Sequence, residues 1–115
     1  MIKIAPIGTK QEQELICSRL GTAFLNQAMA YKASENDIPV GICQFISSGS
    51  SASILCTRTS NRELYSILIR AVMNFCAFNG ATSIIYEAKI TDTEEKALKT
   101  MGFSIQSDRL LAHLV

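Results

Sequence analysis

The chain has 115 residues, of which 48% are hydrophobic and 18% are charged, and its formal net charge is +1. This length and composition predict one folded domain, residues 1–115, with a core of its own. The near-neutral charge argues against a nucleic acid or an anionic membrane as a partner. No apolar run approaches the roughly 20 residues that cross a bilayer.

The cysteines point to a reducing compartment. They lie in apolar segments and lack the paired spacing of a metal site, so no metal is expected. They are Cys17, Cys43, Cys56 and Cys76. Residues 1–8 are too short and too polar at their flank to be a signal peptide. We therefore expect reduced core thiols in a cytoplasmic protein.

The first elements in chain order are an edge strand and a helix. Residues 3–7 alternate weakly and include a proline, which has no amide donor for a central ladder. Thr9 and Glu12 form a capping box, and Gly21 is a typical end, so a helix is expected between them. Its apolar stripe is Leu15, Ile16 and Leu20. Residues 22–27 are open between a turn and a short second helix.

A three-stranded meander follows. The predicted strands cover residues 28–33, 38–47 and 52–57, and their short polar links predict antiparallel pairing. Gly49 as the first residue of the second turn suits type II′. In that register Cys43 lies opposite Cys56, and Phe45 lies opposite Ile54.

The longest element is a helix over residues 60–80, around which the chain is organised. Ser60 and Glu63 form a capping box at its start, and Gly80 is placed to end it. Its apolar stripe is Leu64, Ile67, Leu68, Ala71, Val72 and Phe75. We expect Leu68, Val72 and Phe75 to be almost fully buried. Strand-like runs precede and follow this helix, which predicts a βαβ unit.

The C-terminal part predicts a short helix and two strands. Thr91 and Glu94 form a third capping box, and Gly102 closes the helix. Strands are expected over residues 103–106 and 110–115, with a turn at 107–108.

This order of elements resembles the GNAT acyltransferase superfamily over nearly the whole chain. KALKTMGF at residues 96–103 is similar to the family's FYEKLGF segment, and NDIPVGICQF at residues 36–45 is similar to its dgkiVGfa strand. The resemblance implies an α/β (α+β) fold, with a mixed, mostly antiparallel central sheet and helices on both faces. It also implies acetyl-CoA as cofactor, and a small amine, a protein N-terminus or a lysine as acceptor. A homodimer is a further expectation.

The resemblance also assigns a cofactor loop. The family binds acyl-CoA through a Gln/Arg-x-x-Gly-x-Gly loop that enters the long helix, and residues 60–65 align with it. Glu63 and Tyr65 replace its two glycines with a negative charge and a large side chain, so we expect no pyrophosphate site of the family's kind. The residues at the family's cofactor positions are Cys56, Arg58, Ser60, Asn61 and Arg62.

The catalytic residues that the resemblance implies are fewer. Glu87 is the candidate general base, near the split of the sheet. Leu98 stands where the family often has a proton-donating tyrosine, and Thr91 stands where it often has an asparagine. A backbone N–H of residues 53–57 would polarise the thioester carbonyl. His113 is expected to pack in the apolar tail or at its rim.

Two functions therefore remain open. The first is an acyl-CoA-dependent N-acetyltransferase of unknown amine substrate. The second is a non-catalytic GNAT-like interaction or sensor domain that has lost acetyl-CoA binding. Fold alone does not decide between them.

Overall fold

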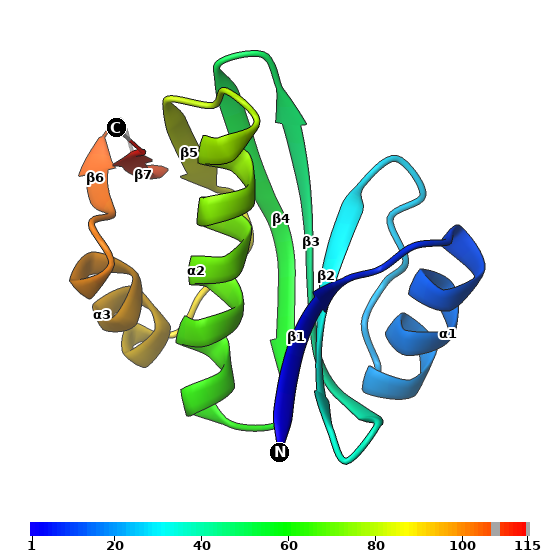
Figure 1. The fold of residues 1–115 in the computed structure, drawn as a ribbon. Coiled ribbons are helices and arrows are strands. Elements are labelled where there is room, and N and C mark those ends of the chain that lie inside the picture. The colour runs from blue at the N-terminus through cyan, green and yellow to red at the C-terminus, as the bar shows by residue number, and fades with distance from the viewer. Residues whose placement is uncertain (107–108, 115) are drawn as a thin grey trace.

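A mixed sheet forms the centre of the molecule. The computed structural model describes residues 1–106 and 109–114, and within them seven strands form one sheet with helices on both faces (Figure 1). The strands are β1 (Ile2–Pro6), β2 (Met29–Glu35), β3 (Ile38–Ser48), β4 (Ser51–Thr59), β5 (Ser83–Tyr86), β6 (Ser104–Gln106) and β7 (Arg109–His113). The helices are α1 (Lys10–Leu20), α2 (Arg62–Phe78) and α3 (Asp92–Thr100). None of these helices has the length and apolar character that a membrane crossing requires.

The strand order is β1-β2-β3-β4-β5-β7-β6. β4 and β5 run parallel, and the other described neighbours run antiparallel. The predicted edge strand, antiparallel meander and βαβ unit are therefore confirmed. α1 covers one face, and α2 and α3 cover the other (Figure 1), as the resemblance to the GNAT superfamily implies. The predicted turn at 107–108 and the last residue of the predicted final strand lie outside the described residues.

Two tight turns connect the meander. Asn36 and Asp37 have φ angles of +52° and +66°, a left-handed conformation that short polar residues tolerate best after glycine. Gly49 has a φ of +60°, as the type II′ turn requires. Phe45 lies opposite Ile54, as predicted from this turn.

A β-bulge then shifts the register of the β3–β4 pair. Leu55 has no partner, Cys56 lies opposite Gln44, and Cys43 lies opposite Thr57. The predicted Cys43–Cys56 pairing is therefore wrong, because one inserted residue moves the two thiols to opposite faces of the sheet. All four cysteines are free thiols.

The start of α2 differs from the prediction by one residue. Asn61 is the N-cap, with extended backbone at φ −149°, and its Oδ1 accepts a hydrogen bond of 3.0 Å from the Leu64 amide. The predicted Ser60–Glu63 capping box is wrong, because Glu63 is the second residue of the helix and not the third. Gly80 follows the helix with a φ of +100°.

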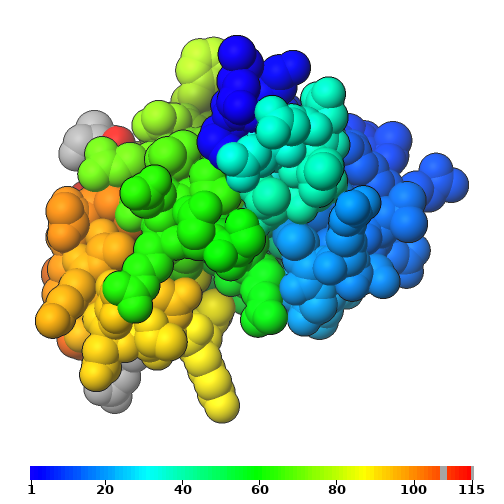
Figure 2. All heavy atoms as spheres, turned by 90° about the horizontal axis from the view of Figure 1, so that it is seen from below, coloured from blue at the N-terminus to red at the C-terminus, as the bar shows by residue number. Residues whose placement is uncertain are grey.

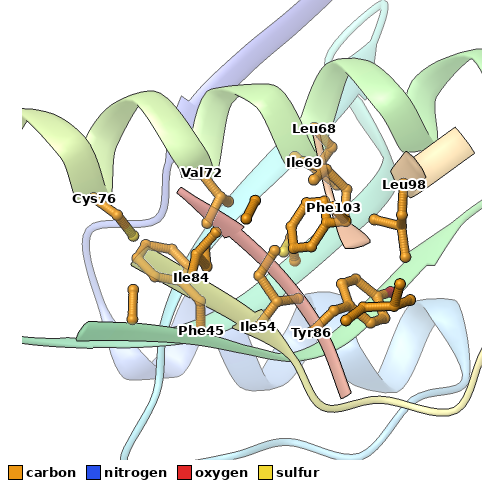
Figure 3. Close-up of a cluster of buried hydrophobic side chains, with 14 of the residues drawn as sticks. Phe45, Ile54, Leu68, Ile69, Val72, Cys76, Ile84, Tyr86, Leu98 and Phe103 are labelled. Carbon is orange, nitrogen blue, oxygen red and sulfur yellow. The ribbon is translucent and has the colours of Figure 1, made fainter. Parts of the chain in front are cut away.

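The main core lies between α2 and the sheet (Figure 3). The α2 side chains that point toward the sheet include Leu68, Ile69, Val72 and Cys76. The predicted burial of Leu68 and Val72 is confirmed. The prediction that Ile67 belongs to the core-facing stripe is wrong, because Ile67 is 47% exposed. Phe75 is half-buried rather than almost fully buried, because it packs at the rim with its ring centroid 5.7 Å from that of Tyr31.

The face under α1 has a smaller apolar cluster. Its buried members are Ile16, Cys17, Ala30 and Ile42. The predicted helix is confirmed, with Thr9 as its N-cap and Gly21 as its left-handed C-cap. The prediction that Leu15 belongs to the apolar stripe of this helix is wrong, because its side chain is 72% exposed. Gln13 is buried on this helix, with an exposed fraction of 2%.

Gln13 belongs to a buried polar network. Gln44 is fully buried, and its Oε1 accepts hydrogen bonds of 2.9 Å from Gln13 Nε2 and from the Leu25 amide. Its Nε2 donates to the Ala23 carbonyl at 2.8 Å. These bonds hold residues 22–27 in an irregular path, which settles the segment as a turn-containing loop and not a helix.

Candidate functional site

The sheet opens where β4 and β5 diverge. The two strands pair from Ser51 and Ser83 as far as Ile54 and Tyr86, and the Glu87 amide donates to the Ile54 carbonyl at 2.9 Å. β4 then continues to Thr59 beside β3, without β5 on its other side. The bulge at Leu55 lies at the same level, and bulges bend a strand away from its neighbour. The split therefore leaves backbone groups of β4 unpaired along one edge.

A groove of about 430 Å³ lies beside this edge, and we call it the α2–α3 groove. Its lining residues are Thr59, Ser60, Asn61, Arg62, Tyr65, Thr91, Thr93, Glu94 and Ala97. They come from the end of β4 and from the first turns of two helices. Figure 2 views this end of the molecule, with the start of α2 in green beside residues from 88 onward in yellow and orange.

Two helix N-termini meet at the α2–α3 groove. Thr91 caps α3 and Asn61 caps α2, so both positive helix ends contribute lining residues. Because Asn61 satisfies only the Leu64 amide, the amides of Arg62 and Glu63 have no hydrogen-bond partner among the described residues. The groove thus offers free N–H donors at the positive ends of two helices, an arrangement that binds anions.

The two charged side chains that line the groove, Arg62 and Glu94, have opposite signs. Arg62 lines it and is exposed. The Glu94 carboxylate accepts a 2.8 Å hydrogen bond from the Thr91 amide as part of the predicted capping box, which is confirmed. Glu63 is exposed and is not among the lining residues, so its charge lies outside the groove.

Tyr65 points inward from α2. It is 5% exposed, and its hydroxyl donates to the Tyr86 hydroxyl at 2.8 Å, beside the split. Burial raises the pKa of Tyr86 to about 12, partly offset by hydrogen bonds with the hydroxyls of Thr57 and Tyr65. Burial, followed by the proximity of Tyr86, also raises the pKa of Tyr65. Both phenols are therefore neutral at physiological pH.

The predicted cofactor residues separate into two groups. Ser60, Asn61 and Arg62 line the α2–α3 groove. Cys56 and Arg58 do not, because they lie opposite Gln44 and Ile42 and so face the α1 side of the sheet. Cys56 Sγ lies 3.0 Å from the hydroxyl of Thr22 there.

Glu87 lies in a different groove, of about 510 Å³, which we call the β5–β7 groove. Its lining residues are Tyr86, Glu87, Ala88, Lys89, Ile90, Glu95, Ile105, Arg109 and Leu110. The Glu87 side chain is exposed, and its backbone marks the point where the split begins. The structure therefore places the candidate base near the split but apart from the candidate cofactor residues.

The structure also places the other residues that the sequence analysis singled out. Leu98 is fully buried in the main core, and Thr91 lines the α2–α3 groove as the N-cap of α3. His113 is exposed at the end of β7, opposite Ser83, which agrees with a rim position. Within the described residues, no group of three His, Cys, Asp or Glu side chains is placed to hold a metal ion.

Solved structures share this fold over 91% to 100% of the chain. The Escherichia coli ribosomal-protein-S18-alanine N-acetyltransferase has a TM-score of 0.79 at 10% identity, covering 99% of this chain and 94% of the other. A Bacillus subtilis acetyltransferase in complex with CoA has a TM-score of 0.75 at 14% identity, covering 100% of both chains. A Streptococcus pneumoniae acetyltransferase of the GNAT family has a TM-score of 0.71 at 19% identity, covering 91% and 89%. This chain has the GNAT acetyltransferase fold.

No protein-family model and no curated protein matches the sequence. At 10% to 19% identity these likenesses concern the GNAT fold, and the chemistry has to be argued from the residues of this chain. Sequence reasoning missed Thr59, Thr93 and Ala97 of the α2–α3 groove and most of the β5–β7 groove. The confirmed Thr91 capping box was the available signal, since it identifies a second helix N-terminus.

Proposed function

We propose that this chain is an acyl-CoA-dependent N-acetyltransferase whose cofactor places its pyrophosphate in the α2–α3 groove. The observation that carries the proposal is the meeting of two helix N-termini in one groove beside the free edge of β4. Helix N-termini bind phosphate through free amides and the helix dipole. This proposal departs from the prediction that residues 60–65 offer no pyrophosphate site of the family's kind, because the Ser60–Glu63 capping box does not form and Tyr65 turns toward the core.

Residues of both first turns would hold the pyrophosphate. The amides of Arg62 and Glu63 and the Arg62 guanidinium supply donors from α2, and the hydroxyls of Thr91 and Thr93 supply donors from α3. Tyr65 leaves this space open because its side chain turns into the core toward Tyr86. The Glu63 carboxylate lies outside the lining, and the Glu94 carboxylate, which lines the groove, accepts a hydrogen bond from the Thr91 amide.

The free edge of β4 would receive the thioester arm. Part of the predicted range 53–57 is already paired with β5, so the donors for the thioester carbonyl come from the unpaired stretch that begins at Leu55. The amine attacks the carbonyl carbon, a C–N bond forms and the C–S bond breaks. Glu87 takes the amine proton, directly or through water, and the leaving thiolate takes a proton from solvent because Leu98 has none to give.

Two measurements test this proposal. Acetyl-CoA at a hundredfold excess over its dissociation constant should stabilise the protein by about 2.7 kcal/mol in thermal unfolding. With an accepted amine, Glu87→Gln should lower kcat by about 100-fold without changing acetyl-CoA affinity. Glu14→Gln, an exposed glutamate on α1, is the matched control. No stabilisation by acetyl-CoA would contradict the proposal.

A second candidate is a non-catalytic GNAT-like interaction or sensor domain, with a homodimer as its proposed assembly. Two observations favour it. The buried Leu98 offers no proton to a thiolate, and the hydroxyls of Tyr65 and Tyr86 are bonded to each other beside the split. This candidate predicts no stabilisation by acetyl-CoA and a dimer in sedimentation measurements.

A further inference from the structure

We propose that the β5–β7 groove binds the acyl acceptor, and that this acceptor is a small primary amine that also carries a carboxylate. This inference rests on the proposed acyltransferase function and names its substrate class. It is drawn from the position of the groove and from the charges that line it.

The two grooves adjoin at the tyrosine pair. Tyr65 lines the α2–α3 groove, Tyr86 lines the β5–β7 groove, and their hydroxyl oxygens are 2.8 Å apart. Glu94 and Glu95, which are consecutive on α3, also divide between the two grooves. A donor in one groove and an acceptor in the other would therefore lie on the two sides of this tyrosine pair.

The β5–β7 groove is lined by two carboxylates, Glu87 and Glu95, and by two cations, Lys89 and Arg109, and no ion pair among the described residues joins any two of these four. Glu87, Lys89 and Arg109 are exposed, and no ion pair involves them among the described residues. Glu95, the other acid, is paired with Lys99 at 3.2 Å. The groove thus complements a ligand that carries an ammonium group and at least one negative charge.

This charge pattern discriminates between acceptor classes. A diamine or a protein lysine would bring a cation without a carboxylate close to Lys89 and Arg109, and like charges brought together disfavour binding. An amino acid meets both signs. Its ammonium lies toward Glu87 and its carboxylate toward Arg109, whose planar guanidinium binds carboxylates through two donors.

The position of Glu87 suits the required proton transfer. Its amide is bonded to the Ile54 carbonyl at 2.9 Å, so its backbone is fixed where β4 and β5 separate. An ammonium held by Glu87 loses one proton to the carboxylate and becomes the nucleophile. After attack on the thioester carbonyl, the second proton leaves the new amide nitrogen to water.

The test compares L-alanine with L-alaninamide as acceptors, with 1,4-diaminobutane and a lysine peptide as further arms. The release of CoA thiol from acetyl-CoA gives kcat/KM for each. We expect L-alanine to exceed L-alaninamide by about tenfold. The amine of L-alaninamide is a weaker base than that of L-alanine, so a larger fraction of it is unprotonated at neutral pH. This difference favours L-alaninamide and therefore works against the expected result.

Variants connect the preference to the groove. Lys89→Gln and Arg109→Gln should each raise the KM for L-alanine by about tenfold, without changing the KM for L-alaninamide or for acetyl-CoA. Lys96→Gln removes the same charge from an exposed position of α3 outside the lining residues and should change nothing. Equal use of both acceptors, or a preference for the diamine or the peptide, would overturn the proposal.

A binding measurement separates this proposal from the proposed function. Amide chemical shifts are recorded while L-alanine is added to the protein without acetyl-CoA. Changes at residues 86–90 and at Arg109 that L-alaninamide does not cause support the groove, even if acetyl-CoA does not bind. Acetyl-CoA binding with no such changes and no preference in rate overturns the groove proposal alone.

Discussion

The two faces of the sheet are held together by different forces. On the α2 face, fully buried apolar side chains such as Leu68, Phe45 and Ile84 form a continuous core (Figure 3). On the α1 face, the apolar cluster is small, and the buried amides of Gln13 and Gln44 tie residues 22–27 to the sheet. The α2 face is therefore stabilised mainly by burial, and the α1 face depends on satisfied hydrogen bonds.

The two faces also differ in their relation to the grooves. The start of α2, the long helix packed on this face, lines the α2–α3 groove. The loop on the α1 face lines neither the α2–α3 nor the β5–β7 groove. We therefore expect mutations to affect the two faces in different ways, by global unfolding on one and by local opening on the other.

The largest effect is expected from truncating the α2 core. Leu68→Ala should lower the free energy of unfolding by about 2–5 kcal/mol, because it leaves a cavity under a rigid helix. Ile67→Ala, its half-exposed neighbour on the same helix, should cost less than about 1 kcal/mol. Urea unfolding measures both, and equal losses would show that the helix packs differently.

The next effect concerns the polar network of the α1 face. Gln44→Ala should cost roughly 1–3 kcal/mol, because it leaves the Leu25 amide and the Ala23 carbonyl without their partner. Hydrogen exchange at Leu25 should accelerate more than exchange in α2. Gln27→Ala changes an exposed glutamine in the same segment and is the control. Uniform acceleration throughout the protein would remove the proposed contrast between the faces.

Alkaline pH should weaken the α2 face. Burial raises the pKa of Cys43 from 9.0 to about 12 and that of Tyr86 from 10.0 to about 12. The unfolded chain therefore loses these protons first, so stability is fully present below pH 9 and falls as pH rises toward 12. The slope reaches about 1.4 kcal/mol per pH unit for each group. Urea unfolding across this range should show the loss, and Cys43→Ala should remove its first part. A flat profile above pH 9 would contradict the burial of these groups.

The smallest effect distinguishes the two possible caps of α2. Asn61→Ala should cost about 1 kcal/mol, because the Leu64 amide loses its acceptor, while Ser60→Ala should cost almost nothing. Thr9→Ala, which removes the corresponding cap of α1, provides the comparison across the sheet. A larger loss of stability for Ser60→Ala than for Asn61→Ala would support the predicted Ser60–Glu63 capping box instead.

The sequence predicted the elements and their ends well, because these depend on local chemistry. Glycines at positions 21, 80 and 102 take positive φ angles after the helices, and Thr9 and Thr91 cap two of them as expected. At α2 two good capping residues, Ser60 and Asn61, are adjacent in the sequence. The propensities of these residues alone do not determine which one the helix uses.

Features that depend on distant partners were less predictable. The bulge at Leu55 changes which residues face each side, yet the apolar residues around it fit either register. The Gln13–Gln44 bond joins positions 31 residues apart. The α2–α3 groove combines residues 59–65 with residues 91–97, so its lining emerges only when both helices are placed on the sheet.

The proposed function depends most on an anion site built from two helix N-termini. Calorimetric titration with acetyl-CoA tests it directly, using the unmodified protein, Arg62→Glu and Arg70→Glu. Arg62 lines the α2–α3 groove, whereas Arg70 is exposed on the same helix outside the lining. We predict saturable binding to the unmodified protein, an affinity at least about tenfold weaker for Arg62→Glu, and no change for Arg70→Glu. No binding to the unmodified protein, or equal weakening by both substitutions, would contradict the anion site.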